Sequence, residues 1–144
     1  MTIDHDRYEA AYLAGILREA KTIALVGASP NAARPSYGVM QFLLSKGYRV
    51  IPVNPGQAGK EILGQTTYAT LADIPESIDM VDVFRASEYL HEVVDDAIAL
   101  DPRPKAIWSQ LSVRDDLAAR VAEAAGIKVV MDRCPAIELP RLGL

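Results

Sequence analysis

The chain of 144 residues has only one cysteine, one tryptophan and two histidines. The single cysteine, Cys134, excludes a disulfide bond within the chain and indicates a reducing, intracellular compartment. A lone buried thiol is usually inert packing, although Arg133 beside it would lower its pKa. His5 and His91 lie far apart in sequence, and neither has a partner at metal-ligand spacing, so we expect both to be solvated and no metal to be bound.

The catalytic motifs that a short sequence can reveal are also missing. There is no HExxH, paired CxxC, Walker A lysine or GxSxG. No nucleophile has a base at a recognisable spacing. We therefore expect no catalytic residues, and the chain is predicted not to be an enzyme.

Positive charge and long apolar runs are scarce. Fifteen Lys and Arg stand against 19 Asp and Glu, and the net charge of −4 argues against a nucleic acid or a membrane surface as the partner. No apolar run approaches the roughly 20 residues that cross a bilayer. Residues 1–15 have neither the basic start nor the apolar core of a signal peptide. These features predict a cytoplasmic protein, and the length predicts one domain over residues 1–144.

Short β-branched runs alternate with helical patterns from residue 22 to residue 131. The alternation predicts an α/β fold, a Rossmann-like doubly wound parallel sheet of five or six strands in three α/β/α layers. Strand 22–26 is expected in the centre, between strands 49–53 and 80–84. A weak edge strand is expected near Thr67. The main predicted strands are 22–26, 49–53, 80–84, 106–108 and 128–131.

Apolar stripes at helical spacing fill the segments between the strands. An amphipathic helix opens the chain near Tyr8. Ser36 and Ser87 are predicted N-caps of two further helices. The last stripe begins with Leu117 and ends before Gly126, a residue that commonly stops helices. All these stripes are expected to pack on the sheet.

In a doubly wound sheet the ligand lies beyond the carboxyl ends of the strands, where the strand order reverses. A glycine turn after strand 22–26 leads into a helix start, whose free N–H groups and dipole favour an anion. Arg34 adds a planar fork of donors suited to phosphate. A plain turn with a solvated arginine would fit the same residues, so this alternative stays open. The candidates in this loop are Gly27, Ala28, Ser29, Arg34, Pro35 and Ser36.

The end of strand 49–53 carries Val53, Asn54 and Pro55. A dinucleotide dehydrogenase has an Asp or Glu here for the ribose hydroxyl, and a glycine where this chain has Ser29. Two departures at the two diagnostic places argue against NAD. Asn54 and Pro55 are also common turn formers, so a purely structural role stays open.

The other strand ends supply a flat apolar surface and polar groups. Phe84 followed by Arg85 suits an adenine and a phosphate, although a core Phe and a surface Arg would explain them equally well. Asp82 shares a face with Phe84, so we expect it to be partly buried and to accept hydrogen bonds from loop N–H groups. Gln110 could bind a ligand or a loop.

Several blocks of sequence occur together in this chain, and as a set they are specific. They are VGAS at 26–29, RPS at 34–36, VNP at 53–55, VDVFR at 81–85 and VVMDRC at 129–134. The set resembles the stand-alone CoA-binding proteins, small domains similar to the nucleotide-binding domain of the succinyl-CoA synthetase alpha subunit. The likeness covers roughly residues 8–142. It implies a Rossmann-type fold that binds coenzyme A or an acyl-CoA without hydride transfer.

The resemblance also implies roles for the candidates. Gly27, Ala28 and Ser29 would lie against the phosphates, with Arg34, Pro35 and Ser36 completing that loop; Val53, Asn54 and Pro55 would border the adenosine, Phe84 and Arg85 would close the crevice, and Gln110 would lie near the pantetheine. Ser109 and Ser112 depart from the family pattern, which tends to have an apolar residue and a glycine there. The synthetases' active-site histidine belongs to a domain outside the likeness, so ligase activity does not transfer.

Three functions stay open on this sequence. The first is a non-catalytic CoA-binding module that acts as a carrier, sensor or regulator, with a protein partner not identified by the sequence. The second is an enzyme that acts on CoA thioesters, or an NAD(P)-dependent reductase, against which Asn54 and the missing nucleophile–base pair count. The third is a domain with a vestigial pocket, against which Arg34 and Arg85 count.

Overall fold

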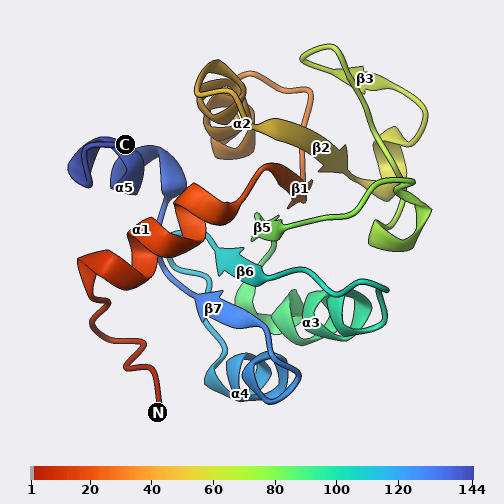
Figure 1. The fold of residues 1–144 in the computed structure, drawn as a ribbon. Coiled ribbons are helices and arrows are strands. Elements are labelled where there is room, and N and C mark those ends of the chain that lie inside the picture. The colour runs from red at the N-terminus through yellow and green to blue at the C-terminus, as the bar shows by residue number, and fades with distance from the viewer. Residues whose placement is uncertain (1) are drawn as a thin grey trace.

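The computed structural model describes residues 2–144 and is built around a five-stranded parallel sheet (Figure 1). The strands lie in the order β2-β1-β5-β6-β7, so β1 is flanked by β2 and β5 as predicted. The sequence boundaries were off by one residue at three strand ends. The strands are β1 (Thr22–Val26), β2 (Arg49–Val53), β5 (Met80–Val83), β6 (Ala106–Ser109) and β7 (Lys128–Val130).

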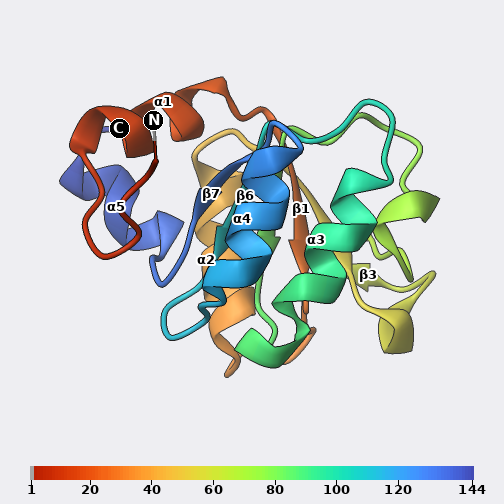
Figure 2. The same cartoon turned by 90° about the horizontal axis from the view of Figure 1, so that it is seen from below.

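Helices cover both faces of the sheet and give the three α/β/α layers that the sequence predicted (Figure 2). One face packs against α3 (Leu90–Ile98) and α4 (Asp116–Ala124), and the other against α1 (Ala10–Glu19), α2 (Pro35–Ser45) and α5 (Pro135–Arg141). None of the helices in residues 2–144 has the length and apolar character that crossing a membrane requires.

The strands are mostly apolar because both faces of the sheet are buried. In β1, Ala24 and Val26 pack in the core beneath α3 and α4, whereas Ile23 and Leu25 pack in the core beneath α1 and α2. A parallel sheet covered on both faces leaves few positions for a solvated side chain, and here the exposed ones are at strand starts, such as Arg49 and Lys128. The continuous apolar run therefore predicted this strand correctly.

The segment between β2 and β5 holds short elements instead of the single edge strand expected near Thr67. The strands β3 (Glu61–Ile62) and β4 (Gln65–Thr66) form a small antiparallel hairpin, and Tyr68 makes one isolated parallel bridge to Val53. Three 3₁₀ turns complete the irregular segments, namely η1 (Pro55–Gln57), η2 (Leu71–Asp73) and η3 (Ser87–Tyr89).

The two predicted serine N-caps are wrong. Helix α2 begins at Pro35, which suits the first helical position because it has no N–H to satisfy, and Arg34 is therefore the cap residue. Ser36 is buried one residue further along. Ser87 opens η3, and its hydroxyl accepts a hydrogen bond from the backbone N–H of Arg114.

The predicted apolar stripe of α4 is also wrong in part. Leu117 is 70% exposed, and the helix buries Ala118, Ala119 and Ala122 instead. The Asp115 carboxylate accepts from the N–H of Ala118 and caps the helix. Small alanines on the buried face let the backbone of α4 lie close to the sheet, which a stripe of larger side chains would prevent.

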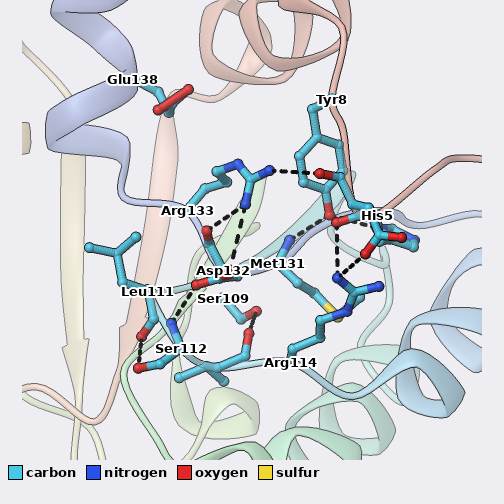
Figure 3. Close-up of polar contacts among 12 residues, drawn as sticks. His5, Tyr8, Ser109, Leu111, Ser112, Arg114, Met131, Asp132, Arg133 and Glu138 are labelled. Atoms are coloured by element: carbon cyan, nitrogen blue, oxygen red, sulfur yellow. Dashed lines mark hydrogen bonds and ion pairs between the residues drawn. The ribbon is translucent and has the colours of Figure 1, made fainter.

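The N-terminal segment packs beside β7, and its Tyr8 lies next to Met131 in Figure 3. The hydroxyl of Tyr8 accepts from the backbone N–H of Met131, and that of Tyr12 donates to Val129 O and accepts from Val129 N. His5 was expected to be solvated, but its side chain is 10% exposed and lies 2.6 Å from the Tyr8 hydroxyl. The segment therefore acts as a cover for the open edge of β7.

Candidate functional site

A cavity of about 640 Å³ opens beyond the carboxyl ends of β1, β5 and β6. Val53 and Pro55 line an adjoining hollow of about 410 Å³, which shares Gly27, Asn54 and Arg85 with the cavity. The twelve predicted residues therefore lie together, at the predicted edge of the sheet. The ten that line the larger cavity are Gly27, Ala28, Ser29, Arg34, Pro35, Ser36, Asn54, Phe84, Arg85 and Gln110.

The β1–α2 loop presents backbone N–H groups to this cavity. The N–H groups of Gly27 and Ala28 both donate to the Val53 carbonyl oxygen, which ties the loop to β2. Those of Ser29 and Ser36 make no hydrogen bond within residues 2–144. Ser36 also stands in the first turn of α2, where the helix dipole is positive. The loop has the donors and the potential of an anion site.

Asn54 holds the neighbouring loop in place. Its amide nitrogen donates to the carbonyl oxygen of Ala28 at 2.7 Å, and its amide oxygen accepts from the N–H of Gly56 at 2.9 Å. Both ends of the side chain are thus occupied by backbone groups. At the position where a dinucleotide dehydrogenase carries a ribose-binding acid, this chain has a residue that joins the β1 and β2 loops.

The two arginines on the rim of the cavity differ in their surroundings. Arg34 is exposed and forms no ion pair with any of the residues that the structure describes. The guanidinium of Arg85 lies 4.2 Å above the ring of Tyr89, and its Nη1 is 3.8 Å from a carboxylate oxygen of Glu92. Arg34 is therefore free to turn toward a ligand, whereas Arg85 is partly held.

A buried carboxylate lies behind the cavity wall. Asp82 is fully buried in β5, and its Oδ1 accepts from the side-chain amide nitrogen of Gln110 at 2.8 Å. Burial raises its pKa to about 7, against the smaller opposing effect of this hydrogen bond. The expectation that loop N–H groups donate to Asp82 is wrong. The N–H groups of the neighbouring strands are used in the hydrogen bonds of the sheet, and the donor to Asp82 is the side chain of Gln110.

Cys134 lines the cavity and is buried. Burial raises the pKa of its thiol, against the smaller opposing effect of hydrogen bonds with the backbone of Ile137 and Ala136, and the nearby Asp82 and Glu138 add to the rise. The predicted lowering by Arg133 is wrong, because the Arg133 guanidinium lies over the ring of Tyr8, 5.0 Å from its centroid. Cys134 is therefore a neutral thiol in the cavity wall.

The loop after β6 is held by the two serines that depart from the family pattern (Figure 3). The hydroxyl of buried Ser109 donates to the Val113 carbonyl oxygen, and the N–H of Ser112 donates to the Asp132 carboxylate at 2.6 Å. Ser112 has a φ of +65°, a conformation that glycine adopts more easily. The loop thus keeps a glycine-like turn with a serine in it.

Sequence reasoning missed part of the cavity wall. Leu111 is 53% exposed at the cavity, directly after Gln110, and its apolar character beyond a strand end was the available signal. Cys134 was singled out only as a buried thiol. The wall residues missing from the predicted site are Val39, Ala86, Leu111, Val113 and Cys134. Within residues 2–144, no three His, Cys, Asp or Glu side chains are grouped as metal ligands.

The family model described as "CoA binding domain" matches residues 21–140. The uncharacterized protein YneT of Bacillus subtilis is 35% identical over 119 residues, which are 83% of this chain and 85% of YneT. A hypothetical protein from Pyrococcus horikoshii is 37% identical and superposes with a TM-score of 0.89, covering 100% of this chain and 99% of that protein.

A longer protein shares a shorter stretch. "Acetate--CoA ligase [ADP-forming] II" of Archaeoglobus fulgidus is 29% identical over 76 residues, which are 51% of this chain but 11% of the ligase. The similarity is therefore to one part of that ligase.

Proposed function

The chain belongs to the CoA-binding domain family, and from this premise we propose that it binds coenzyme A or an acyl-CoA as one non-catalytic binding domain. The observation that carries the proposal is that backbone N–H groups and arginine side chains meet at the carboxyl edge of the sheet. Ser29 and Ser36, whose N–H groups make no hydrogen bond within residues 2–144, border the same cavity as the two rim arginines, Arg34 and Arg85. Backbone donors combined with guanidinium groups suit a diphosphate.

The arrangement of the cavity fits a long ligand with an anionic middle. The phosphates would lie against Gly27–Ser29 and Arg34–Ser36, and the adenosine against the hollow bordered by Val53–Pro55. The loops after β1 and β6 are two strand spacings apart, roughly 10 Å. An arm that leaves the phosphates along the strand ends would therefore reach Gln110 and the apolar wall beyond it.

A role in binding rather than catalysis is supported by the chemistry of the cavity wall. No histidine lines the cavity in the part of the chain that the structure describes. Its one thiol, Cys134, has a raised pKa, which opposes the thiolate that a nucleophile needs. The carboxylate of Asp82 has no exposed surface from which to act on a substrate.

The tests are native mass spectrometry of the purified protein and thermal melting with added ligands. We expect a co-purifying or added CoA species to bind, and stabilisation to follow RT ln(1 + [L]/Kd), about 2.7 kcal/mol at a hundredfold excess over Kd. NAD should stabilise the protein less, because both ends of the Asn54 amide are hydrogen-bonded to backbone groups and are not available to the ribose of NAD. Equal or greater stabilisation by NAD would favour the reductase alternative and contradict the proposal.

A further inference from the structure

Asp82 and Gln110 form an isolated polar pair at the back of the cavity. The only hydrogen bond that Asp82 receives from a side chain is the one from Gln110 Nε2, at 2.8 Å, among the residues described. Its second oxygen, Oδ2, is sealed from solvent and has no hydrogen-bond partner within residues 2–144. The strand neighbours in register are Leu25 and Trp108, which offer the carboxylate an apolar setting. The protonation of Asp82 is therefore coupled mainly to the side chain of Gln110.

The amide of Gln110 has one end on Asp82 and the other toward the cavity. Gln110 lines the cavity and is nearly buried. Its Oε1 makes no hydrogen bond within residues 2–144, but unlike Oδ2 of Asp82 it is not sealed from solvent. The amide oxygen therefore keeps access to the cavity, as an acceptor without a donor.

The protonation of Asp82 decides which end of this amide faces the cavity. An ionised carboxylate only accepts hydrogen bonds, so it requires the NH₂ end of Gln110, and the amide oxygen faces the cavity. A proton on Oδ1 can be donated to Gln110 only if the amide turns, which brings its NH₂ end to the cavity. A proton on Oδ2 would have no acceptor, because that atom has no partner. Protonation therefore favours the turned amide.

We propose that Asp82 is a positioning residue that, through Gln110, makes the cavity distinguish the free thiol of CoA from its thioesters. This inference rests on the proposed function. The amide oxygen favours a ligand end that can donate, and the thiol S–H of free CoA is such an end. The turned NH₂ end favours an end that only accepts, and a thioester carbonyl is such an end.

Both states are accessible near neutral pH, because burial raises the pKa of Asp82 to about 7. The groups that face Asp82 from the packed elements are few. Leu25 on β1 and Trp108 on β6 do not titrate, and Cys134, directly before α5, has a raised pKa and stays neutral. Glu138, also on α5, pairs with Arg141 at 3.4 Å. Gln110 is the side chain whose hydrogen bond opposes the rise in the pKa of Asp82.

The experiment measures the affinities of CoA and acetyl-CoA by titration calorimetry between pH 5.5 and pH 8. The two ligands carry the same phosphates, so titration of the phosphates affects both Kd values equally and cancels in their ratio. The ratio therefore reports only the difference at the sulfur end. We expect Kd for acetyl-CoA divided by Kd for CoA to rise about tenfold over this range, the effect of one mismatched buried hydrogen bond.

Three variants assign the effect. Asp82→Asn cannot change charge, so its ratio should not vary with pH, and Gln110→Met removes the amide and should flatten the ratio as well. Glu76→Gln changes an exposed carboxylate that pairs with Arg49, at the end of β2 away from the cavity. In this variant the ratio of Kd values should vary with pH as it does in the unmodified protein. A ratio that is flat in the unmodified protein overturns the inference but leaves CoA binding intact. A pH-dependent ratio that persists in Asp82→Asn or Gln110→Met also overturns it. If neither ligand binds, the proposed function is overturned, and this inference with it.

Discussion

A Cβ atom placed on Gly27 would lie 2.5 Å from the carbonyl oxygen of Phe84. No real Cβ approaches a backbone oxygen so closely. Gly27 also has a φ of +86°, which side chains strain to adopt. The loops after β1 and β5 can therefore approach one another only because residue 27 lacks a side chain. These two loops carry residues 27–36 and Arg85, which line the cavity, so the contact sets the width of the candidate site.

Gly27→Ala should therefore cost more stability than backbone strain alone. The strain from positive φ costs about 1–2 kcal/mol, and the clash with Phe84 should add about 1–3 kcal/mol as the two loops are forced apart. Urea unfolding measures the sum. Gly47→Ala is the matched control, since Gly47 has a φ of +93° with open space around its Cβ position. Equal losses of stability in the two variants would show that the contact with Phe84 adds nothing to the cost of Gly27→Ala.

The buried carboxyl of Asp82 should make the unmodified protein less stable as the pH rises. Its pKa increases from 3.8 in the unfolded chain to about 7 in the fold, so the folded state holds the proton more tightly. The stability that this proton confers is complete below about pH 4 and is lost as the pH rises through about 7. Asp82→Asn should therefore gain stability relative to the unmodified protein over this range, by up to about 4 kcal/mol.

Urea unfolding at pH 5 and pH 8.5 measures this difference. Glu76→Gln is the control, because pairing with Arg49 lowers the pKa of Glu76 and its contribution is lost only at acid pH. It should show no such gain between the two pH values. A difference between Asp82→Asn and the unmodified protein that stays constant from pH 5 to pH 8.5 would contradict the raised pKa of Asp82.

The sequence predicted the sheet well because strands buried on two faces leave a clear signal. β1 and β2 are continuous apolar runs, and the strand order followed from their alternation with helices. The sequence missed α5, which begins at Pro135 and contains Pro140, because two prolines in seven residues obscure a helical pattern. It also misplaced Leu117, since periodicity in a short alanine-rich segment does not decide which face is buried.

The candidate site was predictable where residue type alone limits the chemistry. A glycine turn, arginines and an asparagine together at neighbouring strand ends are typical of an anion site, and these residues do line the cavity. The states of Asp82 and Cys134 were not predictable, because a pKa depends on burial and on neighbours from other strands and helices. Arg133 is adjacent to Cys134 in sequence, yet its guanidinium lies over Tyr8.

Tyr12 should contribute to stability through its hydroxyl. Among the residues described, β7 has a strand partner only in β6, and the Tyr12 hydroxyl pairs with both the N–H and the carbonyl of Val129 on the open side of β7. Tyr12→Phe should leave these two groups without protein partners and cost about 1–3 kcal/mol. Thermal or urea unfolding measures the loss. Tyr37→Phe is the control, because the Tyr37 hydroxyl makes no hydrogen bond within residues 2–144. A cost as small as that of Tyr37→Phe would mean that water replaces the hydroxyl freely.

The two rim arginines should be distinguishable by what they do without a ligand. Each is expected to make charge-assisted hydrogen bonds to phosphate, so Arg34→Ala and Arg85→Ala should each weaken CoA binding about ten- to a hundredfold. Arg34→Lys should recover only part of the affinity, since an ammonium lacks the fork of donors. The free protein should keep its stability in Arg34→Ala, because Arg34 has no ion pair in the described part of the chain. Arg85→Ala should lose up to about 1 kcal/mol, because its contacts with Tyr89 and Glu92 lie at the surface.

Titration calorimetry gives the affinities, and melting of the ligand-free variants gives the stabilities. Arg120→Ala removes the same charge from the exposed side of α4, outside both hollows at the carboxyl edge, so it reports the effect of net charge alone. A loss of affinity in Arg120→Ala as large as in Arg34→Ala would reduce the arginine effect to long-range attraction. Unchanged affinity in both rim variants would instead mean that the phosphates lie elsewhere. Because Arg34 stands at the helix start and Arg85 at the end of β5, loss in both variants requires one ligand to reach both loops, as a diphosphate bound across them would.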